Sequence, residues 1–213
     1  MNKYLFPGVV LALLLVPGWA HAVPRVTPME QVRESTEKVI TILQDETLDQ
    51  QGRWDAIGVI INDRFDFRSM SQSILATNWQ RATPEERERF VEYFSQYIEE
   101  TYRTKIESYD NQEILYKNET IYGKRAEVET AIVTESTEIP IVYKLKDNDG
   151  KWFAYDVVIE GVSLVNNYRS TFSTIVKNDG MDGLLNDIKR RVDKYKQENA
   201  GNVEPVPEST ESE

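Results

Sequence analysis

The sequence contains no cysteine and only one histidine, His21. Without cysteine, the chain has no disulfide, no thiol nucleophile and no attachment site for a lipoprotein anchor. His21 lies in an N-terminal segment that we expect to be removed, so the remaining chain would have no histidine. This excludes a Ser-His-Asp triad, a histidine zinc site and histidine acid–base catalysis. We also expect no metal and no cofactor.

Residues 1–22 have the features of a cleaved signal peptide. Lys3 supplies the positive start, residues 5–16 are mainly apolar, and Ala20-His21-Ala22 is a small-residue cleavage site. The apolar stretch is short for a membrane anchor. We therefore expect export with cleavage after Ala22. A periplasmic location follows, because an exported chain without disulfides suits that compartment.

Positive charge is also scarce: 25 Lys and Arg oppose 36 Asp and Glu, which gives a net charge of −11. An acidic chain is a poor nucleic-acid binder and is repelled by anionic lipid surfaces. Its docking partners would then be proteins rather than bare bilayer. The length predicts one domain over residues 23–198. Residues 199–213 are rich in Pro, Ser and Glu, which predicts a disordered acidic tail.

Helical signals dominate the first half of the chain. Pro28 is placed to begin a first helix, and residues 54–61 indicate a second, short one. Asp66 is a candidate N-cap for a third helix. Residues 83–86 (Thr-Pro-Glu-Glu) form a capping box, and three- and four-residue apolar spacing then predicts a helix to about Tyr109.

Alternating patterns follow and predict four strands, at residues 114–122, 126–132, 141–145 and 152–159. Residues 147–150 (Asp-Asn-Asp-Gly) predict a hairpin turn. Two amphipathic helices, around residues 164–175 and 184–195, close the domain. Adjacent strands after a run of helices predict an α+β fold with an antiparallel sheet of about four strands.

Carboxylates are the strongest candidates for chemistry. Asp156 and Glu160 would share one face of a regular strand, and Asp66 is a further acid that could do acid–base work. The alternative, which we favour, is a solvated strand face and a turn acid. Arg169 beside Tyr168 indicates either a contact to a phosphate or docking acid, or a surface ion pair. The apolar positions fit an ordinary core and an acyl-chain pocket equally well.

Two blocks of residues carry a family resemblance. The first comprises Phe65-Asp66-Phe67, Met70, Trp79, residues 82–90, Phe94, Thr101-Tyr102 and Tyr109. The second is YDVVIEGVSLVNNYRSTF at residues 155–172, extended by residues 180–184. Together they resemble the MlaC-type periplasmic phospholipid carriers, also called toluene-tolerance proteins. One departure is Ala76, where the family often has glycine.

This resemblance implies a lipid carrier rather than an enzyme, with bound phospholipid as its cargo. The family passes phospholipid between an outer-membrane lipoprotein–porin complex and an inner-membrane ABC transporter carrying an MCE-domain protein. That traffic maintains outer-membrane lipid asymmetry. The implied fold is NTF2-like, with a twisted antiparallel sheet, helices packed over it, and acyl tails between the two layers. We expect a monomer that binds no nucleic acid.

The facing patterns combined with the implied fold nominate a set of lipid-binding residues. They are Met70, Ile74, Phe94, Ile98, Tyr102, Val128, Ile132, Tyr143, Val157, Ile159, Val162, Val165, Tyr168 and Phe172. Arg169 is the candidate for the head group or a docking surface. Two other functions stay open: an NTF2-like small-molecule enzyme using Asp66 or Asp156, and an interaction module with an apolar groove.

Overall fold

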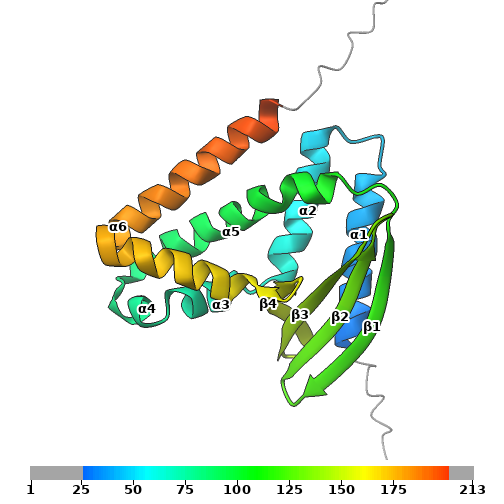
Figure 1. Cartoon of the computed structure of the whole chain (residues 1–213), viewed down its shortest axis with the longest axis horizontal. Helices are drawn as coiled ribbons and strands as arrows, with labels where there is room; N and C mark the ends of the chain where they lie inside the picture. Colours follow the sequence, from blue (N-terminus) through cyan, green and yellow to red (C-terminus); the bar gives the residue numbers. More distant parts are fainter. Residues whose placement is uncertain (1–25, 202–213) are drawn as a thin grey trace, which may run out of the picture.

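The computed structural model describes residues 26–201, so the predicted signal peptide and most of the predicted acidic tail lie outside the described residues. The helices are α1 (Pro28–Leu43), α2 (Gln50–Arg64), α3 (Phe67–Leu75), α4 (Thr77–Arg81), α5 (Pro84–Glu107) and α6 (Leu164–Gly201). The strands are β1 (Glu113–Tyr122), β2 (Arg125–Val133), β3 (Glu138–Asn148), β4 (Lys151–Ile159) and β5 (Val162–Ser163). The α+β prediction is confirmed (Figure 1).

Local capping chemistry sets most helix starts. Thr27 and Thr83 each form a capping box, and Asp66 accepts a hydrogen bond from the Ser69 N–H at the start of α3. Residues near Asp49 had indicated a loop, but Asp49 accepts from the Gly52 N–H and begins α2 four residues earlier than expected. The longer helix results from this N-cap.

The sheet is an antiparallel meander in the order β1-β2-β3-β4-β5, with one more strand than predicted. The extra strand, β5, has only two residues and follows a tight turn at Glu160 (φ 49°) and Gly161 (φ 81°). The predicted β3–β4 hairpin is confirmed, with Asp149 (φ 52°) and Gly150 (φ 89°) at its tip. Positive φ at two consecutive residues matches the right-handed twist of the flanking strands.

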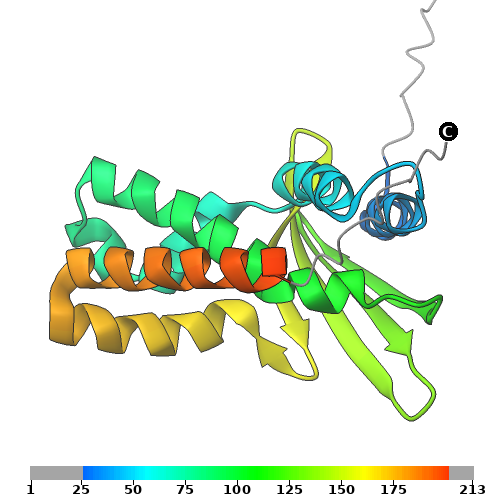
Figure 2. The same ribbon diagram turned by 90° about the horizontal axis from the view of Figure 1, so that it is seen from above.

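The apolar side chains of the sheet that meet helices lie on one face, the helix-bearing face. α1 lies against β1 and β2, whereas α3 and α6 contact β4, and α5 and α6 extend away past the β4 edge of the sheet (Figures 1 and 2). The two predicted closing helices are the arms of α6, which breaks at Gly180 (φ 73°, ψ −175°). The arms fold back on each other along α5 (Figure 2).

The joint between α3 and α4 contains a strained residue. Ala76 adopts φ 49° and ψ −118°, a conformation that favours glycine, and its side chain is exposed. Ala76→Gly should therefore raise the free energy of unfolding by about 1 kcal/mol. Denaturant titration of both proteins measures the change.

A matched control for Ala76→Gly is available in α2. Ala56 lies inside that helix, so Ala56→Gly should lower the free energy of unfolding by about 0.5–1 kcal/mol. Equal losses from the two substitutions would contradict the assigned strain at Ala76.

Candidate functional site

Two apolar clusters lie on the helix-bearing face of the sheet. The first, which we call the helix cluster, joins α3, α5 and both arms of α6 to β4; its buried members include Phe67, Met70, Phe90, Phe94, Val157, Tyr168, Phe172 and Leu184. The second, the sheet cluster, lies under α1 and consists of Val32, Ala126, Val128, Leu145, Trp152 and Ala154. Phe65 and Tyr143 pack against both clusters.

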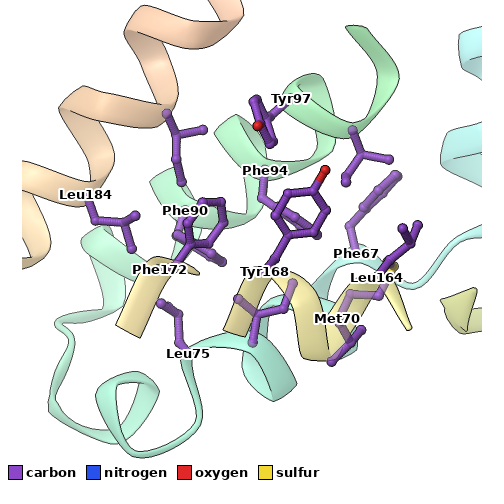
Figure 3. Packing of buried hydrophobic residues seen from close by; sticks show 14 of the residues in the cluster. Phe67, Met70, Leu75, Phe90, Phe94, Tyr97, Leu164, Tyr168, Phe172 and Leu184 are labelled. Atoms are coloured by element: carbon purple, nitrogen blue, oxygen red, sulfur yellow. The ribbon is translucent and has the colours of Figure 1, made fainter. Parts of the chain in front are cut away.

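Aromatic rings fill the centre of the helix cluster. The Phe94 ring lies 5.8 Å from Phe90 in a stacked arrangement and 5.7 Å from Tyr168 in an edge arrangement (Figure 3). Tyr168 also stacks on Phe172 at 5.5 Å. These separations are those of favourable aromatic pairs. The centre of the cluster is therefore occupied by the protein's own side chains.

Beside these clusters, one end of the same sheet face carries half-exposed aliphatic side chains. We call this group the aliphatic strip; it comprises Ile114, Ile132, Ile139, Ile141, Ile159 and Val162. Cross-strand pairing aligns them: Ile132 lies opposite both Ile114 and Ile139. Ile159 likewise pairs with Ile141 and with Val162.

The aliphatic strip spans all five strands. Its side chains share a face with the sheet cluster, because Ile132 is separated from Val128 and Ala126 on β2 by even numbers of residues, and such residues point to the same face of a strand. Within residues 26–201, Ile114, Ile132 and Ile139 belong to neither cluster, and Val162 is 55% exposed. An apolar surface that crosses a whole sheet and is only partly covered by the protein's own side chains is suited to receive hydrocarbon.

Most of the predicted lipid-binding residues come together. Within the helix cluster lie Met70, Ile74, Phe94, Ile98, Val157, Val165, Tyr168 and Phe172, with Tyr102, Tyr143 and Ile159 packed at its margin. Val128 lies in the sheet cluster, whereas Ile132 and Val162 lie on the aliphatic strip. Sequence analysis left out Ile114, Ile139 and Ile141. The sequence shows that these residues alternate along their strands, but only the pairing between strands shows that they are neighbours of Ile132 and Ile159.

Asp156 has a structural role at the start of α6. It is buried and accepts hydrogen bonds from Ser163 Oγ (2.7 Å) and the Val165 N–H (3.1 Å). Lys144 Nζ lies 3.8 Å from Oδ2, the same carboxylate oxygen that accepts from Ser163. Glu160 does not join it, because the turn at Glu160 ends the regular strand. Asp156 therefore caps the N-terminus of α6, and each of its two carboxylate oxygens already accepts a hydrogen bond.

Asp66 occupies a different environment, a shallow hollow of about 320 Å³ whose lining includes Phe65, Phe67 and Phe153. Burial raises the pKa of the Asp66 carboxyl, but hydrogen bonds from Lys146 and Ser69 outweigh it and leave the pKa below its usual range. An ionised carboxylate already saturated with donors is poorly placed to abstract a proton. Neither acid therefore has the geometry of a general base.

Arg169 projects from the first arm of α6 toward the end of α3. Its Nε donates a 2.8 Å hydrogen bond to the Ser73 carbonyl, and its side chain is exposed. This bond satisfies a carbonyl near the helix end and ties α6 to α3. A contact from Arg169 to a lipid head group or a docking partner stays a prediction.

Several phenols lie in apolar surroundings at the site. Burial raises the pKa of Tyr143 to about 12 and also raises the pKa of Tyr168. Both side chains are therefore neutral hydrogen-bond donors at physiological pH.

The described part of the chain also lacks two other kinds of feature. None of the helices in residues 26–201 combines the length and the hydropathy needed to span a bilayer. In the same residues, no cluster of three or more acidic, Cys or His side chains is arranged to hold a metal ion.

Known proteins resemble this chain in sequence. The toluene tolerance protein ttg2D of Pseudomonas putida is 27% identical over 143 residues, which cover 66% of this chain and 64% of that protein. MlaC, the binding protein of the Haemophilus influenzae intermembrane phospholipid transport system, is 23% identical over 141 residues, covering 62% of this chain and 66% of that protein. The matched region thus spans just under two thirds of both relatives.

The fold also has a solved counterpart. The phospholipid-binding protein of Ralstonia solanacearum, solved in complex with a phospholipid, superposes with a TM-score of 0.72 at 22% identity. The superposition covers 79% of this chain and 98% of that one. The sequence model of the MlaC protein family matches residues 33–190. Because that match includes most of the chain, the protein belongs to the MlaC family.

Proposed function

We propose that this protein binds phospholipid and carries it across the periplasm with the acyl tails held between the sheet and the helices. The observation that carries the proposal is the aliphatic strip, an open apolar surface continuous with two buried clusters. Membership of the MlaC family supports it, as do a relative and a structural neighbour named for phospholipid transport and binding.

The energetics of the cargo agree with this role. Removing one acyl CH₂ from water is worth about 0.8 kcal/mol, so two ordinary tails carry on the order of 20 kcal/mol. Free lipid would almost never cross an aqueous gap, and a carrier has to shield nearly the whole tail. The aromatic centre of the helix cluster is already filled, so tails would lie on the aliphatic strip and enter by displacing helices from the sheet.

The proposed partners are the complexes at either end of the route. Lipid would be exchanged with an outer-membrane lipoprotein–porin complex and with an inner-membrane ABC transporter carrying an MCE-domain protein, which would maintain outer-membrane asymmetry. The net charge of −11 favours basic docking patches on both partners. We further propose that the protein acts as a monomer and catalyses no reaction, with exposed Arg169 near the head group.

Direct analysis of the purified protein tests this proposal. The full chain is expressed with its N-terminal signal, purified from periplasm without detergent, and extracted with organic solvent for mass spectrometry. We expect about one or more phospholipids per protein, because tail burial dominates the binding energy. A folded, monodisperse protein free of lipid would contradict the proposal and would direct attention to the hollow at Asp66.

A further inference from the structure

Oxygen-bearing side chains on the helix-bearing face of the sheet include Tyr116, Glu119, Thr130 and Tyr143. The first three have protein partners. The Tyr116 hydroxyl is hydrogen-bonded to Thr36, Glu119 accepts from the Met29 N–H, and Thr130 Oγ1 donates to the Ile141 carbonyl at 3.2 Å. Tyr143 differs, because its hydroxyl makes no hydrogen bond within residues 26–201 and, on a half-buried side chain, is not fully removed from water.

The surroundings of Tyr143 are apolar on several sides. Val128 and Val157 flank it on the neighbouring strands, and the ring packs against both apolar clusters. Ile141 lies two residues away on the same face, so Tyr143 adjoins the aliphatic strip. When acyl tails cover the aliphatic strip, the Tyr143 hydroxyl would lose its remaining contact with water, and a donor left without an acceptor is destabilising. A ligand that supplies an acceptor avoids this penalty.

The chemistry of the cargo narrows the choice of acceptor. Acyl tails have no hydrogen-bonding atoms, and burying a charged phosphate beside valine side chains is costly. The ester carbonyl is a neutral acceptor that lies where the tails meet the glycerol. It is therefore the lipid group best matched to a neutral hydroxyl at the edge of a hydrocarbon surface.

We propose that the Tyr143 hydroxyl donates a hydrogen bond to an ester carbonyl oxygen of the bound phospholipid. This inference rests on the proposed function and makes Tyr143 a residue that selects ester-linked lipids. An ether-linked lipid of the same length would bury the same tail but leave the hydroxyl unpaired. The preference for ester over ether lipid should then correspond to one hydrogen bond, about five- to tenfold in affinity.

A competition experiment with Tyr143→Phe measures this preference. The purified protein is incubated with excess vesicles holding equal amounts of diacyl-ester and dialkyl-ether phosphatidylglycerol with matched chains. It is then re-isolated, and both lipids are quantified by mass spectrometry. The wild-type protein should bind the ester lipid about five- to tenfold more, and Tyr143→Phe should bind the two nearly equally.

Tyr116→Phe is the matched control, because it removes a hydroxyl on the same sheet face that already has a partner in Thr36. It should keep the wild-type ester preference. Thermal unfolding gives a second readout: Tyr143→Phe should unfold close to the wild-type temperature without lipid, since the hydroxyl has no hydrogen bond to lose within residues 26–201.

Three outcomes would overturn the Tyr143 assignment. In the first, Tyr143→Phe keeps the full ester preference. In the second, it loses both lipids equally, which would place the hydroxyl on the head group. In the third, the wild-type protein binds both lipids without preference. Wild-type protein that takes up neither lipid would instead refute the proposed function itself, so the two failures are distinguishable.

Discussion

Replacing Ile132 by aspartate should leave the protein folded and lower its bound phospholipid about five- to hundredfold. Ile132 lies in the aliphatic strip, half-buried and outside both apolar clusters, so its loss removes little core packing. Even a protonated carboxyl group against hydrocarbon costs about 1–3 kcal/mol, and each 1.4 kcal/mol is tenfold in affinity. Lipid per protein, measured by mass spectrometry after detergent-free purification, reports the effect.

Val133→Asp is the matched control for Ile132→Asp. Val133 is the next residue of β2, is also half-buried, and points to the opposite face of the sheet. It should keep its lipid, and circular dichroism should give the same helix and strand content for both variants. If both variants retained lipid at the wild-type level, the aliphatic strip would not be the tail-binding surface.

Removing the Asp156 carboxylate should lower the free energy of unfolding by about 3 kcal/mol, as two hydrogen bonds to a buried charge are lost. Asp156→Ala leaves the Val165 N–H and the Ser163 hydroxyl without their acceptor, and it removes the carboxylate facing Lys144. The first turn of α6 should then loosen from β4. Urea unfolding followed by tryptophan fluorescence measures the loss.

Asp156→Asn separates the structural role of this residue from a catalytic one. An asparagine carbonyl can still accept one of the two hydrogen bonds, so the loss should be about half as large. A catalytic acid is often kept at a cost to stability, and replacing it tends to leave the fold equally or more stable. An Asp156→Ala protein as stable as wild type would therefore contradict the capping role and revive the enzyme hypothesis.

Local chemistry explains why most helix starts and the β3–β4 turn were predictable. The capping boxes at Thr27 and Thr83 and the Asp149–Gly150 hairpin depend on residues within four positions of one another. Such contacts form in the same way whatever the rest of the chain does. The α+β order, the β3–β4 hairpin and the Asp66 cap were predictable for this reason.

Other features required the folded chain. A bulge at Tyr155 places Lys144 opposite Asp156 but Leu145 opposite Ala154, so regular alternation does not predict which β4 side chains face the helices. The fifth strand has two residues, too few to give a periodic signal. Ile114 and Ile139 were likewise missed, because their shared position beside Ile132 depends on pairing between strands.

By itself, the sequence determined most of the elements, their order and the family to which the chain belongs, since these depend on composition, short-range hydrogen bonds and characteristic motifs. Only the tertiary structure decided which apolar residues close on one another and which stay open on the aliphatic strip. It also decided that Asp156 caps a helix and that, within residues 26–201, the half-buried Tyr143 hydroxyl makes no hydrogen bond. The physical reason is that the burial of a residue and its hydrogen-bond partners depend on neighbours that are distant in the sequence and that come together only when the chain folds.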